Sequence, residues 1–223
     1  MYSADAASSG NSQRVAFVYD TRFVRPNAVT EIEVDRIEIQ GKDIFDRDPL
    51  VGHFTFLVEG TDHNDLLVVG LHLASGQHNN RNHDAAMTRL LRELDQLRAE
   101  GTVLQAGEFD ILLAGDLNAN MFDNKVEEFF TSMDSGDWDV LAEAPYPATR
   151  LSGVPLQPRN SRIDYIIASR VNGVQRGLSG EEITASAATV HQDLADDDWD
   201  TFREQFSDHF PVTTCVGVVA DAD

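Results

Sequence analysis

Residues 112–120 read LLAGDLNAN, and the class of the whole chain follows from this stretch and its neighbours. A short apolar run, as expected of a buried strand, leads to Gly115, and Asp116 and Asn118 follow at once. In open α/β sheets, ligands bind beyond the carboxyl ends of the strands. Asp116 and Asn118 are two residues apart, so in extended chain both side chains can project into one site. The alternative is a turn in which the two residues cap the next helix.

Apolar patterns on both sides of this stretch predict further strands and helices. Residues 84–100 have apolar side chains at the spacing that lines one face of a helix, and residues 123–131 predict a second, short helix. The predicted strands cover residues 14–20, 29–39, 51–59, 66–72, 109–114, 163–169 and 211–219. Residues 60–65 predict a turn, and the proline-rich residues 144–160 predict a long ordered loop. Strands that alternate with helical stretches indicate an α/β class.

Composition limits the kinds of partner. The chain has 223 residues, enough for one sizeable domain, and a formal net charge of −21. Such a charge repels polyanions and argues against tight, non-specific duplex binding, although local arginines can still create a phosphate site. No run approaches the roughly 18 apolar residues of a membrane helix, and no signal peptide is visible. Cys215 is the only cysteine, which excludes an intrachain disulfide and leaves the compartment open.

Two later stretches add residues with chemical function. Residues 207–212 (SDHFPV) place Asp208 and His209 directly before an apolar strand, where a packing role is not expected. His209 can donate to a phosphate as a cation, and Asp208 can bind a metal ion. In residues 161–169 (SRIDYIIAS), Asp164 interrupts an apolar strand, and a buried carboxylate needs a partner. His209 is the natural partner, because a carboxylate orients an imidazole and favours its charged form; Arg162 is the alternative.

GDLN, RIDYI and SDHFPV, in this order, resemble the endonuclease/exonuclease/phosphatase superfamily, which includes deoxyribonuclease I and neutral sphingomyelinases. Further matches lie in residues 14–20, 46–54 and 68–75, so the resemblance extends from about residue 14 to residue 218. It implies an α/β fold, a deoxyribonuclease I-like sandwich of two mixed β-sheets flanked by helices. It also implies a hydrolase of phosphodiester or phosphomonoester bonds.

The resemblance implies a role for each matching residue. Asp116 would orient or deprotonate the attacking water, and Asn118 would bind a phosphoryl oxygen. His209 would contact the scissile phosphate and stabilise its developing charge, while Asp164 would hold His209.

The remaining matches concern the metal and the edges of the site. Asp208, together with Asp116, would bind or position the divalent metal, Mg²⁺ or Mn²⁺. His72 matches a histidine on the leaving-group side, and Arg47 would reach a phosphate. The substrate would be a phosphate ester from a nucleic acid, a phospholipid or a sugar phosphate.

One departure from the family pattern concerns the N-terminal side. The family begins with a strand ending in Asn and continues to a Gln–Glu pair whose Glu is the principal Mg²⁺ ligand, and no counterpart precedes residue 14. We therefore expect a poorly ordered segment over residues 1–13, a family domain over residues 14–218 that lacks its N-terminal part, and a tail over residues 219–223. An exposed strand edge would then favour self-association. The alternative function is a catalytically inactive binding or scaffold fragment of the same fold.

Overall fold

The fold is seen in a computed structural model, which describes residues 15–32, 38–39, 42–43, 48–73, 80–100, 110–119, 138–141, 148–152, 157–158, 162–169, 183–185, 187–195 and 198–218. Arg47 and the helix predicted over residues 123–131 lie outside these ranges. Within them, every helix is too short or too polar to cross a membrane.

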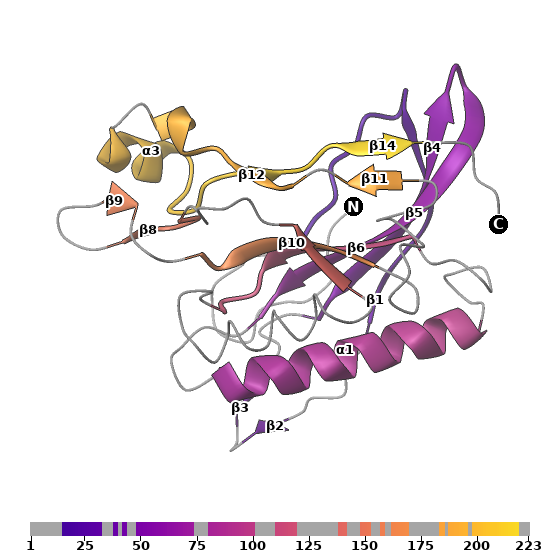
Figure 1. Ribbon diagram of the computed structural model, residues 1–223, viewed down its shortest axis with the longest axis horizontal. Coiled ribbons are helices and arrows are strands. Elements are labelled where there is room, and N and C mark those ends of the chain that lie inside the picture. Colours follow the sequence, from indigo (N-terminus) through magenta and orange to yellow (C-terminus); the bar gives the residue numbers. More distant parts are fainter. Residues whose placement is uncertain are drawn as a thin grey trace.

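A mixed six-stranded sheet forms the centre of the molecule (Figure 1). Its strand order is β1-β4-β5-β6-β10-β7, and only the β5–β6 pair is parallel. Parallel neighbours need a crossover connection, and helix α1 (Asn80–Glu100) lies between these two strands in the chain. The strands are β1 (Val24–Glu31), β4 (Leu50–Val58), β5 (Thr61–His72), β6 (Ile111–Asp116), β10 (Asp164–Ser169) and β7 (Trp138–Leu141).

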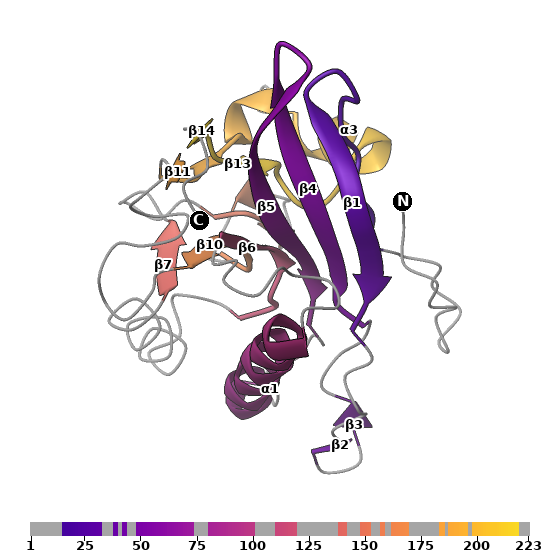
Figure 2. The ribbon, with the colours of Figure 1, turned by 90° about the vertical axis from the view of Figure 1, so that its right-hand side faces the viewer.

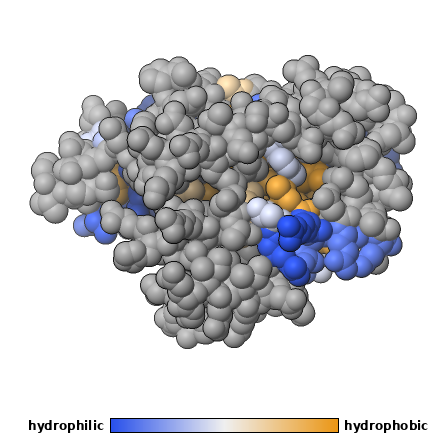
Figure 3. Space-filling model, turned by 60° about the horizontal axis from the view of Figure 1, so that its bottom comes forward, coloured by the Kyte–Doolittle hydropathy of each residue, from blue (hydrophilic) through white to orange (hydrophobic). Residues whose placement is uncertain are grey.

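One face of this sheet packs against α1, and Figure 2 views this helix roughly along its axis. Met87, Leu90 and Leu94 on the helix are almost fully buried, and they share one core cluster with Leu67 and Val69 of β5. These helix residues belong to the apolar stripe expected from the sequence. Figure 3 views the side of the molecule that carries α1, where hydrophilic surface adjoins a smaller apolar area. The amphipathic pattern therefore directs the helix onto the sheet.

A second layer covers the opposite face. Leu66, Leu112 and Ile166 of the central sheet share a cluster with Ala188, and Val212 and Val216 pack against it. This layer contains two small antiparallel sheets, β11–β14 and β12–β13. Their strands are β11 (Ile183–Ala185), β14 (Val216–Val218), β12 (Thr189–Val190) and β13 (Val212–Thr213). The predicted α/β sandwich is thus confirmed.

The remaining elements are short. Strands β2 (Glu38–Ile39) and β3 (Lys42–Asp43) pair with each other, as do β8 (Leu151–Ser152) and β9 (Gln157–Pro158). The 3-10 helix η3 (Gln192–Ala195) and helix α3 (Trp199–Gln205) precede β13 in the chain. Phe202 of α3 and Phe210 form a third small core with Leu151 and Ala195.

Three local predictions were wrong. The strand predicted over residues 29–39 has other bounds, since β1 covers Val24–Glu31. The turn is not residues 60–65: Glu59 and Gly60 have φ angles of 53° and 80°, as in a two-residue hairpin turn, and β5 begins at Thr61. Residues 15–20 form no regular strand and contain a single bridge residue, Ala16. Phe17 instead packs edge-on against Phe54 with ring centroids 5.3 Å apart, so tertiary packing overrides the strand pattern.

Candidate active site

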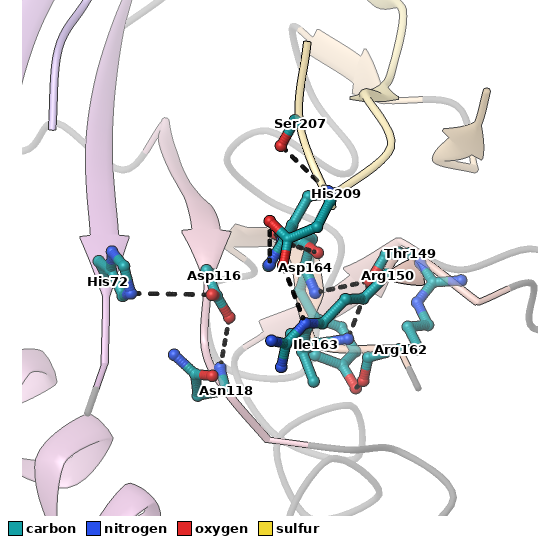
Figure 4. A network of polar contacts seen from close by, with 12 residues as sticks. His72, Asp116, Asn118, Thr149, Arg150, Arg162, Ile163, Asp164, Ser207 and His209 are labelled. Carbon is teal, nitrogen blue, oxygen red and sulfur yellow. Dashed lines mark hydrogen bonds and ion pairs between the residues drawn. The ribbon is translucent and has the colours of Figure 1, made fainter. Parts of the chain in front are cut away.

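The predicted site residues begin as one row across three neighbouring strands. His72 ends β5, Asp116 ends β6 and Asp164 begins β10. Asp116 is the register partner of both, parallel to His72 and antiparallel to Asp164. Register partners point to the same face of a sheet, so the three side chains project together toward the second layer (Figure 4). The His72 Nε2 atom lies 3.7 Å from Asp116 Oδ2.

His209 reaches this row from the segment between α3 and β13. Its Nδ1 atom lies 3.0 Å and 3.1 Å from the two carboxylate oxygens of Asp164, so the expected hydrogen bond is present. The His209 backbone N–H donates to Ser207 Oγ. The alternative pairing of Asp164 with Arg162 is not what forms: Arg162 is fully buried and its guanidinium stacks over the Tyr165 ring.

The turn after β6 fixes the position of Asn118. The Asn118 backbone N–H donates to Asp116 Oδ1 at 2.7 Å, and its side-chain nitrogen donates to the Leu73 carbonyl at 2.8 Å. Asn118 has a φ angle of 48°, a left-handed conformation that Asn tolerates better than most residues. The side chain of Asp116 therefore closes its own turn. The helix that the two residues were alternatively expected to cap falls outside the described residues.

Thr149 and Arg150 also lie at the site, although no sequence pattern predicted a functional role for them. Thr149 Oγ1 accepts hydrogen bonds from the backbone N–H groups of Ile163 and Asp164, at 3.0 Å and 3.2 Å. Arg150 forms a bridge with His209, and its Nε atom lies 3.4 Å from Asp208 Oδ2. Both residues come from the segment predicted as a loop. No periodicity or motif there pointed to a site, because their partners are distant in sequence.

The partly buried and highly charged site raises the pKa values of both Asp116 and His209. Burial, followed by the negative charge of Asp164, raises the pKa of Asp116 from 3.8 to about 6, although the hydrogen bond from Asn118 and the charges of His209 and Arg150 oppose this. Burial alone would lower the pKa of His209. The hydrogen bond to Asp164 and the charges of Asp164, Asp116 and Asp208 outweigh burial, and that pKa is raised above 6.5.

Three of these residues could hold a metal ion. Ligand atoms of Asp116, Asp164 and His209 all lie within 4.8 Å of one another. Asp208, predicted as a metal ligand, is not in this group: its carboxylate is 3.4 Å from Arg150 Nε and 4.0 Å from His209 Nε2. The structure thus gathers six predicted residues at one end of the sandwich, and Arg47 falls outside the described residues.

A family model described as the Endonuclease/Exonuclease/phosphatase family matches residues 7–209 of this chain. The chain belongs to the endonuclease/exonuclease/phosphatase family. The match includes the GDLN and RIDYI motifs and ends at His209. Enzymes of this family hydrolyse phosphate esters, which agrees with the chemistry of the row and of His209.

Solved structures support the endonuclease/exonuclease/phosphatase fold at low sequence identity. A functionally unknown conserved protein from Enterococcus faecalis V583 is 19% identical, with a TM-score of 0.59 over 97% of this chain and 77% of its own. The mannosyl-6-phosphatase Bt3783 of Bacteroides thetaiotaomicron is 17% identical, with a TM-score of 0.51 over 89% and 69%. D. rerio TDP2 complexed with single-strand DNA product is 15% identical, with a TM-score of 0.55 over 87% and 68%. No curated protein sequence is significantly similar to the chain.

Proposed function

We propose that this chain hydrolyses phosphodiester or phosphomonoester bonds with the help of Mg²⁺ or Mn²⁺. The observation that carries the proposal is the clustering of Asp116, Asp164 and His209, with His72 beside them at the ends of neighbouring strands. The similarity to a mannosyl-6-phosphatase and to TDP2 bound to a DNA product supports a phosphate-ester substrate.

The donor set fits a hard divalent cation. Mg²⁺ prefers carboxylate oxygens, and Asp116 and Asp164 place two carboxylates side by side, where their repulsion contributes to the raised pKa of Asp116. A cation between them would offset that repulsion. Asp116 would hold the ion, and Asp208 is proposed as a further ligand. When bound, the ion would polarise the phosphate and stabilise developing negative charge.

The side chains supply the remaining chemistry. As a carboxylate, Asp116 would orient the attacking water and accept its proton. His209, kept protonated and oriented by Asp164, would donate to a phosphoryl oxygen as negative charge builds in the transition state. His72 would serve the leaving-group side.

Two further residues are proposed to bind the phosphate. Asn118 uses one amide hydrogen on the Leu73 carbonyl, and its second hydrogen would donate to a phosphoryl oxygen. We also propose that Arg47, which is not among the described residues, contacts a phosphate. The sequence suggested self-association through an exposed strand edge, and we propose that strand β1 provides this edge.

Hydrolysis of p-nitrophenyl phosphate and of bis(p-nitrophenyl) phosphate tests the proposal. We expect turnover with Mg²⁺ or Mn²⁺, loss of turnover in EDTA, and a decrease of roughly 100-fold or more for His209→Ala. The matched control is His191→Ala, because His191 contacts Thr213 and Asp193 away from the site and its loss should leave the rate unchanged. Absence of metal-dependent turnover on both esters would favour the alternative, a binding or scaffold protein.

A further inference from the structure

Arg150 is held rigidly beside the proposed catalytic residues. The backbone on either side of it is bonded to the segment that contains His209: Phe210 N–H donates to the Thr149 carbonyl, and Leu151 N–H donates to the Asp208 carbonyl, both at 2.8 Å. Thr149 also holds the start of β10, where Asp164 lies. Arg150 is therefore fixed relative to both partners of the Asp164–His209 pair.

The side chain of Arg150 is oriented but not enclosed. Its Nε atom is buried, lacks a hydrogen bond among the described residues, and faces the Asp208 carboxylate at 3.4 Å. Yet 44% of the side chain stays exposed. The positive charge reaches the row as well, because Arg150 lowers the pKa of Asp116. Figure 4 places Arg150 in the same network as Asp116, Asp164 and His209.

A phosphate can bind at this site only if a nearby cation offsets the negative charge of the carboxylates. Asp116, Asp164 and Asp208 meet there in a protein of net charge −21, and three carboxylates repel a phosphate. Two other described arginines are committed elsewhere: Arg25 pairs with Asp62, and Arg162 is fully buried. A guanidinium presents several donors in a planar fork that matches phosphate oxygens.

We propose that Arg150 binds a non-bridging oxygen of the substrate's phosphate group, with Asp208 holding the guanidinium in position. This role rests on the proposed function, and it adds a phosphate-binding residue from the segment that includes β8. Arg150 and His209 lie on neighbouring chain segments and bind the same phosphate group. The phosphate therefore contacts two positively charged side chains on one side of the row.

Binding of inorganic phosphate tests the role separately from turnover. Isothermal titration calorimetry of the full chain with Mg²⁺ should give a Kd for phosphate that rises at least roughly 10-fold in Arg150→Ala. The matched control, Arg25→Ala, removes the same charge at the far end of the sheet and should change that Kd less than about twofold. Arg150→Lys should be intermediate, because it keeps the charge and loses the fork.

A kinetic readout separates substrate contact from structural support. Added guanidinium ion should partly restore kcat/KM of Arg150→Ala on p-nitrophenyl phosphate and should have no such effect on Arg25→Ala. If Arg150→Ala unfolds at a lower temperature than the native chain, Arg150→Gln takes its place, since glutamine keeps a polar end without the charge.

The outcomes are distinct. Phosphate affinity that is equal in Arg150→Ala, Arg25→Ala and the native chain overturns the inference, even where hydrolysis is observed. A native chain that binds no phosphate also overturns it. Phosphate binding that depends on Arg150 in a chain without turnover supports this role and defeats the hydrolase proposal instead.

Discussion

Asp164 is the residue whose electrostatic role a single substitution can isolate. Asp164→Asn keeps a partner for His209 but removes a negative charge that raises the pKa of both His209 and Asp116. Both pKa values should therefore fall. We expect a bell-shaped pH profile of kcat/KM in the native chain. Its acid limb, from Asp116, should lie at or below pH 6, because a bound cation offsets the repulsion that raises this pKa, and its alkaline limb, from His209, should lie above pH 6.5. In Asp164→Asn both limbs should move toward lower pH.

An independent measurement is the NMR titration of His209 in the metal-free chain. The pKa of His209 should decrease in Asp164→Asn. An unaltered His209 titration would mean that Asp164 orients the ring without affecting its charge.

The ionised carboxylate of Asp116 lowers the free energy of unfolding at neutral pH. Its folded-state pKa, about 6, exceeds the unfolded value of 3.8, so the protonated carboxyl favours the folded chain and that contribution is lost as pH rises through 6. Asp116→Asn, which cannot ionise, should be more stable than the native chain at pH 7.5 by up to about 3 kcal/mol, with little difference at pH 4. Urea unfolding without metal measures this.

Asp62→Asn provides the control of opposite sign. Arg25 lowers the pKa of Asp62, so the native carboxylate stabilises the fold above pH 3.8 and the substitution should not increase stability at pH 7.5. Equal stability of Asp116→Asn and the native chain at pH 7.5 would show that Asp116 is not strained by its surroundings.

At the scale of the elements, the site depends on how closely β5 and β6 approach. Gly115 has a φ angle of 146°, and a Cβ atom there would lie 2.0 Å from the Leu71 carbonyl oxygen. Gly115→Ala should therefore separate the strands that position His72 and Asp116. We expect a loss of more than about 3 kcal/mol in the free energy of unfolding, together with loss of activity.

Gly60→Ala is the matched control for that substitution. Gly60 also has a positive φ angle, 80°, but a Cβ atom there would meet nothing within 4 Å. Its cost should be the conformational strain alone, about 1 kcal/mol, with activity retained. If thermal and urea unfolding give the two alanine variants equal stability, the close approach of the strands is not what requires glycine at position 115.

At the scale of the whole molecule, net charge opposes the proposed substrate. A formal charge of −21 repels a phosphate ester before it reaches the local cations. Salt screens this repulsion, since the Debye length falls from about 30 Å at 0.01 M to about 10 Å at 0.1 M ionic strength. We expect kcat/KM on p-nitrophenyl phosphate to rise a few-fold over that range. Sucrose at equal osmolality should not reproduce the rise, and a decrease with NaCl would mean that local cations dominate association.

The same scale includes the open edge of the central sheet. Among the strands that the structure describes, β1 ends the six-stranded order, and an edge strand can recruit another chain. Part of this edge is protected, because Pro26 adjoins an irregularity in the pairing with β4. We expect size-exclusion chromatography with light scattering to give a mass that increases with concentration, and Phe23→Ser, which removes an exposed apolar side chain near the edge, to reduce it. A constant monomer mass up to high concentration would contradict self-association.

The fold class, the family and six clustered residues followed from the sequence because their signals are local. GDLN, RIDYI and SDHFPV each join a strand pattern to a polar group at the strand's end, and the Asp164–His209 hydrogen bond followed from the need of a buried carboxylate for a partner. The pattern of residues 15–20 was misleading because alternating exposure does not require strand pairing: Phe17 and Tyr19 are half-buried against Phe54, while Val18 is exposed. The catalytic roles and the domain boundaries stay predictions.

By itself, the sequence determined which residue types meet and in what order, since each motif lies within a few positions of the chain. Only the tertiary structure decided their register, with Asp116 between His72 and Asp164, and the presence of Thr149 and Arg150 at the site. The raised pKa of Asp116 was likewise decided by the tertiary structure. These properties arise from contacts between residues far apart in sequence, and such contacts exist only once the sheet and the segment before β13 have come together.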